Sequence, residues 1–368
     1  MTAAARSAEP MVRLAGVAKT YDAATALHPV DIQVARGEFL TLLGPSGSGK
    51  TTLLNLIAGM IAPSQGRIFI DGEDVTATPP NRRNLGMVFQ NYALLPHLTI
   101  FDNVAYPLRV RKNGAEEIRA KVGRVLDQMQ LGHLARRFPR ELSGGQQQRV
   151  SLARCLVYDP RLILMDEPLG ALDKKLREQM QVEIKRLHLS LGTTILYVTH
   201  DQEEALSMSD RIVLLNHGRI VQSASPAELY FRPRSLFAAT FLGASNLLEV
   251  REASQGEAVL AAGGRIRIGQ QVPGPAGGAM KAVVRPESMV LLADGESHDL
   301  PNALAGTLTL SSILGGVTHH HVALADGSSA MVQELTRQGR PMPAPGSRVR
   351  LAWAAEDTLL LPAEGEGP

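Results

Sequence analysis

The sequence predicts an α/β domain, with a mixed sheet, flanking helices and a helical insert, followed by a small all-β domain. Three observations predict this order. A glycine-rich loop at 44–51 joins an apolar strand to a helix. Residues 160–223 alternate buried strands with helices, which is typical of a mostly parallel sheet covered by helices. After residue 246, short strand-like segments at close spacing favour a small β-barrel.

Composition narrows the class of protein. The chain has 368 residues, enough for two domains, and 44% of them are hydrophobic. A net charge of +2 gives no argument for nucleic-acid binding. The single cysteine, Cys155, excludes an intrachain disulfide. The N-terminal residues lack the apolar core of a secretory signal, and no apolar run reaches the roughly 18–20 residues of a spanning helix. We therefore expect any work at a membrane to depend on a partner.

The elements of the first domain follow from local patterns. Residues 30–35 alternate as a half-buried strand does, and residues 38–44 form an apolar strand ending in glycine. Asp71-Gly72 lies between two apolar stretches and predicts a hairpin. Residues 91–157 are mainly helical, and one helix there carries a single apolar face made of Ile118, Val122, Val125, Leu126 and Met129.

The second half of this domain returns to strands and helices. "RLILMDE" predicts a buried strand that ends in acids, and "TTILYVTH" predicts another. Between them lies a helix that should end at Gly192. A hairpin should turn at 216–218. The apolar stripe of the helix consists of Leu176, Met180, Ile184, Leu187 and Leu191.

The glycine-rich loop predicts a phosphate site. Its glycines let backbone N–H groups surround phosphate oxygens, and the following helix N-terminus adds partial positive charge. Lys50 supplies a point charge for the β- and γ-phosphates, and the Thr51 hydroxyl suits Mg²⁺. The nucleotide-binding residues predicted here, which we call the phosphate loop, are Gly44, Pro45, Ser46, Gly47, Ser48, Gly49, Lys50, Thr51 and Thr52.

Polar side chains at other strand ends complete the site. Asp166 is placed to hold Mg²⁺, and Glu167 beside it to accept a proton from attacking water. His200 ends the next strand and could bond the γ-phosphate. Gln90 ends an earlier strand and could touch Mg²⁺ or the water. Tyr21 could stack on adenine, with a packing role as the alternative.

"LSGGQQQR", at 142–149, has the composition of a second phosphate-binding helix N-terminus. Together with Tyr21, the phosphate loop, Gln90, "LILMDE", "GALD" and His200, it makes residues 11–245 resemble the nucleotide-binding subunit of ATP-binding-cassette (ABC) transporters, a P-loop NTPase cassette. The resemblance implies that two chains pair head to tail. Each ATP would then lie between one phosphate loop and the signature of the other chain, Ser143, Gly144, Gly145 and Gln146.

The resemblance also implies partners and location. Asp173 would lie at the dimer seam of a homodimer. ATP and Mg²⁺ are the implied cofactors. The insert at about 91–157 would contact two membrane-spanning permease subunits at the cytoplasmic face of the inner membrane, served by a periplasmic or lipid-anchored substrate-binding protein. The implied domain limits are 1–10 (flexible), 11–245 (ATPase), 246–362 (β-barrel) and 363–368 (tail).

The C-terminal part points to a bacterial importer. "VVRPESMVLL" and "SSILGGVTHHHVALADG" resemble the oligonucleotide/oligosaccharide-binding (OB)-like repeat of importer ATPases. "DEPLGALDKKLREQMQVEIKRLH" and "FLGASNLLEV" are most similar to spermidine/putrescine importer ATPases. Importers of ferric iron, sugar, sulfate or phosphonate are the alternatives, and a soluble non-transport ATPase is more remote. Three histidines at 319–321 alternate faces on a strand, so they do not predict a metal site, and we expect Cys155 to pack in the core.

Overall fold

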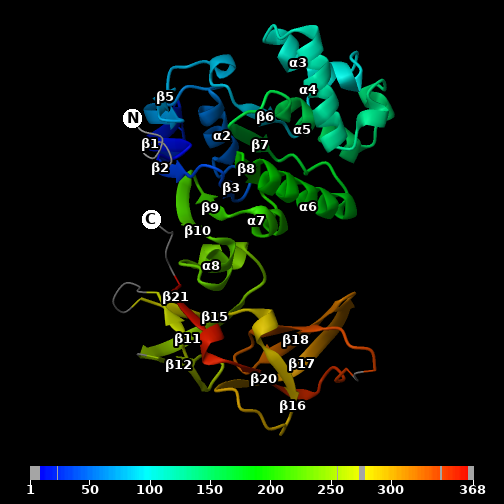
Figure 1. The fold of residues 1–368 in the computed structure, drawn as a ribbon. Coiled ribbons are helices and arrows are strands. Elements are labelled where there is room, and N and C mark those ends of the chain that lie inside the picture. The colour runs from blue at the N-terminus through cyan, green and yellow to red at the C-terminus, as the bar shows by residue number, and fades with distance from the viewer. Residues whose placement is uncertain (1–8, 23, 255, 273–277, 340–341, 364–368) are drawn as a thin grey trace. The chain divides into compact units, whose positions relative to one another are not determined.

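A computed structural model describes residues 9–22, 24–254, 256–272, 278–339 and 342–363 (Figure 1). The chain divides into two compact units, one ending at Ala227 and the other beginning at Glu228. The predicted end of the first domain, at residue 245, lies further along the chain, after α9 (Leu236–Phe241). The predicted N-terminal segment 1–10 and tail 363–368 fall almost wholly outside the described residues.

The first unit contains the predicted, mostly parallel sheet. Its strand order is β10-β9-β3-β8-β7-β6. Every neighbouring pair is parallel except β9 and β10, which form the hairpin predicted at 216–218. The strands are β3 (Phe39–Leu43), β6 (Gly86–Val88), β7 (Leu162–Asp166), β8 (Thr194–Thr199), β9 (Arg211–Asn216) and β10 (Arg219–Ala224).

This sheet is buried on both faces. Successive side chains of a strand point to opposite sides, so one strand contributes to two hydrophobic cores. In β3, Phe39 belongs to one hydrophobic core, and Leu40 and Leu42 belong to the other. The second core also contains α2 (Lys50–Ala58) and an antiparallel sheet of order β2-β1-β4-β5, which the sequence did not predict as a separate sheet. Its strands are β1 (Val12–Tyr21), β2 (Ala24–Val34), β4 (Gln65–Ile70) and β5 (Glu73–Asp74).

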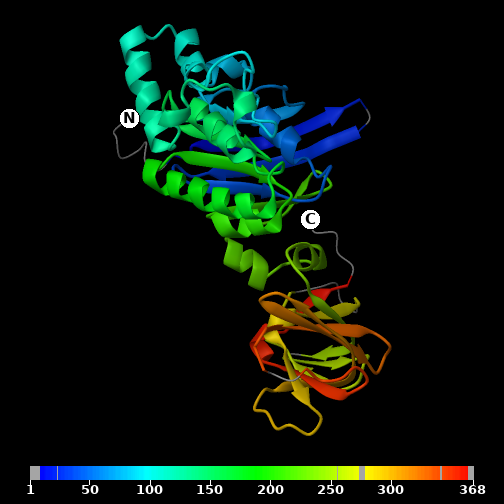
Figure 2. The same ribbon diagram turned by 90° about the vertical axis from the view of Figure 1, so that its right-hand side faces the viewer.

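The helices of the insert pack on the opposite core. They are α3 (Ile100–Val110), α4 (Ala115–Gln128) and α5 (Gly144–Leu156), with short 3₁₀ turns at Gly132–Leu134 and Pro139–Glu141. Another short 3₁₀ turn, at Pro80–Arg82, precedes β6 and lies outside the insert. Both views show α3 and α4, in cyan, as neighbouring helices (Figures 1 and 2). The predicted apolar face of α4 is buried. Cys155 on α5 is 3% exposed, so its predicted packing role is confirmed.

The remaining helices of this unit are α6 (Lys174–Leu191) and α7 (Gln202–Met208). Met180 and Ile184 of the predicted α6 stripe are buried, but Leu191 is 42% exposed. The stripe prediction is wrong there because Leu191 is the last helical residue. The C-cap Gly192, with φ 61°, turns the chain away at the predicted stop. Asp71 and Gly72, with φ 53° and 82°, turn the predicted hairpin.

The second unit is rich in strands, with α8 (Pro226–Phe231) at its start and α9 after it. Its two sheets have the orders β13-β12-β11-β15-β21-β14 and β16-β20-β17-β18-β19. They share one hydrophobic core around the fully buried Trp353. The strands are β11 (Asn246–Ser254), β12 (Glu257–Leu260), β13 (Arg265–Arg267), β14 (Gln270–Gln271), β15 (Met280–Val284), β16 (Val290–Ala293), β17 (Asn302–Leu314), β18 (Val317–Leu324), β19 (Ser329–Leu335), β20 (Arg348–Trp353) and β21 (Leu359–Pro362), with turns at Pro286–Ser288 and Ala355–Asp357.

The histidine run lies on β18 and alternates as expected. His320 is 4% exposed and pairs with the Ser311 hydroxyl at 2.8 Å, whereas His319 pairs with Gln333 at 3.0 Å. Within the described ranges, no group of three or more His, Cys, Asp or Glu side chains is arranged to hold a metal ion.

Candidate nucleotide-binding site

Four parallel strands deliver the predicted site residues to one edge of the sheet. β3 runs into the phosphate loop, β6 leads to Gln90, β7 ends in Asp166 and Glu167, and β8 ends before His200. The register aligns these ends, since Leu43 pairs with Thr199 and Asp166 pairs with Val198. Ligands of open α/β sheets bind at this carboxyl edge.

The phosphate loop requires glycine at two close approaches. A Cβ at Gly44 would lie 2.2 Å from the carbonyl oxygen of Leu215, and one at Gly49 would lie 2.9 Å from that of Ala26. Gly49 also has φ 99° and forms the N-cap of α2. The loop therefore presses its backbone against neighbouring strands, and the N-terminus of α2 opens directly from it. Such a helix N-terminus attracts anions.

Lys50 is held inside this loop. Its side chain is 5% exposed and donates to the carbonyl oxygens of Gly44, at 2.8 Å, and Pro45, at 2.9 Å. Burial lowers the pKa of Lys50, and the nearby carboxylates of Glu167 and Asp166 oppose that shift. The Ser48 hydroxyl is buried and has no hydrogen-bond partner among the described residues. A cradle with an enclosed cation and an unpaired hydroxyl fits a phosphate group.

The carboxylates face the helix end. The Thr51 hydroxyl donates to Asp166 Oδ1 at 3.4 Å. Burial and the neighbouring Glu167 raise the pKa of Asp166. Hydroxyl and carboxylate oxygens are the hard ligands that Mg²⁺ takes, with further positions filled by phosphate and water. These donors fit the ion.

Glu167 adopts a strained backbone conformation. Its φ of 42° places a non-glycine residue in the left-handed region, while its N–H donates to the carbonyl of Val198 at 2.9 Å. The side chain is 22% exposed, and its Oε1 lies 3.1 Å from His200 Nδ1. The turn thus aims the second carboxylate at the histidine, while Asp166 stays in the strand.

Gln90 and Tyr21 are both exposed side chains. Gln90 is exposed, and its Nε2 would be 3.6 Å from a Cβ built on Gly170. Tyr21 is 47% exposed, with the Lys19 ammonium 4.9 Å from its ring centroid. An exposed ring suits stacking better than core packing.

The signature forms a self-capped helix start. Ser143 is the N-cap of α5: its hydroxyl accepts from Gln146 N–H at 3.4 Å, and Gln146 Oε1 accepts from Ser143 N–H at 3.0 Å. Ser143 and Gly144 are exposed, whereas Gly145 is buried. Asp173, also exposed, caps α6 by accepting from Leu176 N–H at 2.9 Å. Both elements present their polar ends to solvent in this single chain.

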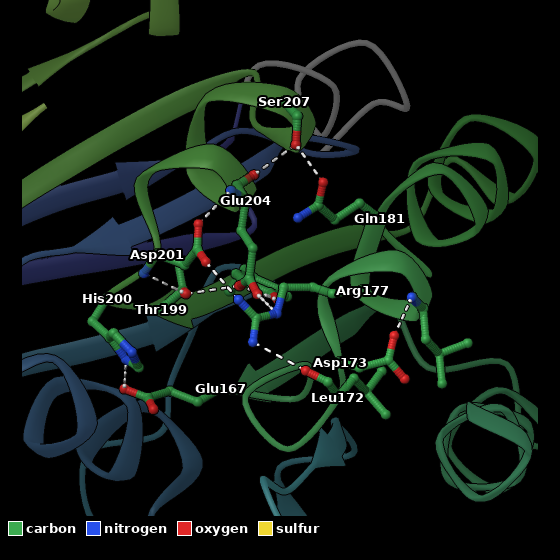
Figure 3. Close-up of polar contacts among 12 residues, drawn as sticks. Glu167, Leu172, Asp173, Arg177, Gln181, Thr199, His200, Asp201, Glu204 and Ser207 are labelled. Atoms are coloured by element: carbon green, nitrogen blue, oxygen red, sulfur yellow. Dashed lines mark hydrogen bonds and ion pairs between the residues drawn. The ribbon is translucent and has the colours of Figure 1, made fainter. Parts of the chain in front are cut away.

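The sequence did not predict the polar network centred on Arg177 of α6 (Figure 3). Arg177 donates to Asp201 Oδ2 at 3.0 Å and to the Leu172 carbonyl at 3.1 Å. Glu204, 2% exposed, accepts from Tyr197 and Thr199 hydroxyls, at 2.8 and 2.7 Å, and burial raises its pKa. Residue spacing was the signal that could have predicted this network. Arg177 lies four residues after Asp173, and Glu204 lies four residues after His200, which is about one helical turn.

Comparison with known protein families identifies the class of this protein. Residues 27–170 match the ABC transporter family, and residues 282–361 match the TOBE domain. The chain belongs to the ABC transporter family as an ATP-binding protein, an ATPase whose hydrolysis drives transport. No helix in the described parts of the chain is long and apolar enough to cross a membrane.

Particular relatives are importer subunits. The spermidine/putrescine import ATP-binding protein PotA of Frankia alni is 46% identical, covering 95% of this chain and 79% of the relative. PotA of Acidothermus cellulolyticus is 45% identical over 94% of this chain and 93% of the relative.

Solved structures resemble the cassette. The chain matches cbiO1 from Clostridium perfringens, part of the ABC transporter complex cbiONQ, with a TM-score of 0.56 and 27% identity, over 60% of this chain and 90% of that one. It also matches the dimeric bacterial ABC transporter cassette MJ0796, with a TM-score of 0.53 and 37% identity, over 59% and 99%. A related MJ0796 structure is a post-hydrolysis state with ADP and phosphate.

Proposed function

We propose that this chain powers the uptake of a polyamine, spermidine or putrescine, by a bacterial ABC importer. The observation that supports the substrate is the name shared by relatives of 39–46% identity over nearly the whole chain. The cassette does not touch the transported solute, so its own site carries no information on substrate choice.

We also propose the assembly. Residues 11–245 form the ATPase domain, and two copies of it pair head to tail. The exposed residues Ser143, Gly144 and Asp173 support this pairing, because they are free to meet a second chain. Two permease subunits hold the pair at the cytoplasmic face of the inner membrane, and a periplasmic or lipid-anchored binding protein delivers the solute. No role for nucleic acid is proposed, because a net charge of +2 gives no argument for one.

Each phosphate loop binds the triphosphate of ATP. Backbone N–H groups of 44–52 and the α2 N-terminus surround the β- and γ-phosphates, and Lys50 moves from the loop carbonyls to phosphate oxygens. Tyr21 stacks on adenine. Thr51, Asp166 and Gln90 would hold Mg²⁺, which neutralises phosphate charge when bound.

Hydrolysis is an in-line attack of water on the γ-phosphorus. Glu167 accepts the water proton, and His200, 3.1 Å from Glu167, bonds the γ-phosphate and keeps the carboxylate in place. Ser143, Gly144, Gly145 and Gln146 of the second copy meet the γ-phosphate from the other side. A chain alone should therefore hydrolyse ATP slowly.

Uptake by proteoliposomes tests the substrate. The chain is reconstituted with its permease subunits and binding protein, and ATP-dependent entry of radiolabelled spermidine is measured. We expect spermidine uptake, and we expect the Glu167→Gln variant to abolish it. Putrescine should compete with spermidine, whereas sugar, sulfate, phosphonate and ferric iron should not. ATP-dependent uptake of one of the other solutes, with none of spermidine, would overturn the polyamine proposal but leave the ATPase intact.

A further inference from the structure

One guanidinium connects two loops that carry different parts of the proposed machinery (Figure 3). Arg177 Nη2 donates to the carbonyl of Leu172, the residue before Asp173. Its Nη1 donates to Asp201, the residue after His200. Its side chain is 29% exposed, and its Nε forms an ion pair with Glu204 Oε1 at 3.8 Å. A planar fork with two separate acceptors holds them at a fixed spacing.

The position of His200 depends on its neighbours in the chain. The His200 side chain is 58% exposed, and its Nδ1 lies 3.1 Å from Glu167 Oε1. On one side, Thr199 is tied to buried Glu204 by a 2.7 Å hydrogen bond. On the other, Asp201 donates its N–H to Thr199 Oγ1 at 3.0 Å and receives Arg177. Hydrogen bonds of Thr199 and Asp201 therefore hold the backbone on both sides of His200, and Arg177 bonds the second of these residues.

The loop at the other end of the fork packs on the signature. A Cβ at Gly144 would lie 3.3 Å from Leu172 Cδ2, and one at Gly145 would lie 2.9 Å from Leu176 Cδ1. Leu172 is 6% exposed, so this contact is enclosed. A shift of the signature N-terminus would therefore push on the side chains of Leu172 and Leu176, which flank Asp173.

We propose that Arg177 is a positioning residue that couples the signature of a chain to His200 of the same chain. The inference rests on the proposed head-to-tail dimer, in which the signature touches the partner's ATP and His200 touches the chain's own. Contact at one ATP site then moves 172–176, Arg177 and Asp201, and sets the distance from His200 to the other ATP. The two sites of the dimer communicate through this fork.

A second ion pair on α6 provides a matched control. Lys185 Nζ lies 2.8 Å from Asp210 Oδ1, with side-chain exposures of 26% and 45%. It joins α6 to the body of the domain as Arg177 does, yet it contacts neither 172–176 nor the backbone around His200. Lys185→Met removes a comparable charge and contact without reaching the site.

The test compares Arg177→Met with Lys185→Met in the full-length chain. We expect Arg177→Met to lower kcat about 10- to 100-fold, the loss typical of a displaced catalytic group, with the Kd for ATP within about threefold. The Hill coefficient for ATP should fall to about 1. Lys185→Met should keep the wild-type kcat and Hill coefficient. Equal effects of the two variants on all three readouts would overturn the proposal.

Further variants keep the test decisive if Arg177→Met folds poorly. Arg177→Lys retains the charge but has no fork, so we expect a wild-type melting temperature and a reduced Hill coefficient. Asp201→Asn combined with Arg177→Lys should lower kcat no further than the stronger single variant. Multiplied losses would refute a shared fork. A wild-type Hill coefficient of 1 would overturn the coupling and leave the ATPase standing, whereas absence of ATP hydrolysis by the wild type would instead refute the proposed function.

Discussion

The phosphate loop and the signature are both glycine-containing segments that open a helix, but the chain treats them in opposite ways. The phosphate loop encloses polar groups that are available to a ligand. Lys50 donates to two loop carbonyls, and the Ser48 hydroxyl is buried without a hydrogen-bond partner among the described residues. In the signature, Ser143 and Gln146 exchange two hydrogen bonds, and Ser143 and Gly144 are exposed.

The difference teaches which ligand each segment serves. A cradle whose polar groups wait inside the fold is built for a ligand of the same chain. A capped and exposed helix start is stable alone and can meet a surface that arrives from outside. We therefore interpret the phosphate loop as the binding half of the chain's own ATP site. We interpret the signature as the part that covers the ATP bound by a second copy.

The largest expected effect comes from Lys50→Ala. Loss of the enclosed cation should reduce ATP hydrolysis by about 10²–10³-fold and abolish the rise in melting temperature that ATP causes. The free energy of unfolding without ATP should change by no more than about 1 kcal/mol. Burial disfavours the charged ammonium and so lowers the pKa of Lys50, and this cost offsets the hydrogen bonds that the side chain makes. Phosphate release and differential scanning fluorimetry measure both.

Lys121→Ala is the control, since Lys121 pairs with Glu117 on the insert surface, 3.0 Å away. If both variants kept the ATP response, the cradle would not be the binding half.

Glu167→Gln should separate binding from chemistry. The amide keeps the shape of the carboxylate but cannot accept the water proton, so we expect hydrolysis to fall about 10²–10⁴-fold while the ATP-induced stabilisation persists. Single-turnover hydrolysis of radiolabelled ATP gives the rate. A wild-type rate in this variant would remove Glu167 from its proposed role.

One substitution made in both segments sharpens the contrast. Ser143→Ala deletes an N-cap and should lower the free energy of unfolding of the ATP-free chain by about 0.5–2 kcal/mol. Ser48→Ala removes a hydroxyl without a partner and should lower it by less than about 0.5 kcal/mol, while weakening ATP binding. Urea unfolding and ATP titration of the two variants measure these values, and the reverse order of stability would break the comparison.

The smallest effect tests whether the signature helix is anchored behind its exposed start. Cys155 is fully enclosed on α5, and burial raises the pKa of its thiol to about 12. At about pH 8 only about one thiol in 10⁴ is then ionised, against a sizeable fraction of a free thiol. Iodoacetamide should label Cys155 only after unfolding, with or without ATP. Rapid labelling of the folded chain would mean that α5 detaches.

Much of this architecture could be predicted from the sequence, because its signals are local. Strand–loop–helix order placed the phosphate loop, and turn chemistry placed the hairpins at Asp71-Gly72 and 216–218. The separate antiparallel sheet depends on pairing between β1 and β4, which are distant in the sequence. No local pattern encodes such pairing, and the exposure of Leu191 likewise depends on where the helix ends.

The candidate site divides in the same way. Motif spacing could predict that Lys50, Asp166 and His200 gather at one sheet edge, since parallel strand ends always meet there. The left-handed backbone of Glu167 and the fork of Arg177 could not be predicted, because both depend on how three loops meet in space.

The central claim is that the signature serves the ATP of a second copy. Its most direct test is light scattering on size-exclusion chromatography of Glu167→Gln, with and without Gly144→Asp, in Mg²⁺-ATP. The account predicts that Glu167→Gln becomes a dimer with ATP. The double variant should remain monomeric with ATP. Its Kd for ATP should lie within about threefold of that of the Glu167→Gln chain, because its own phosphate loop is intact. Weaker ATP binding by the monomeric double variant, or undiminished dimerisation, would contradict the account.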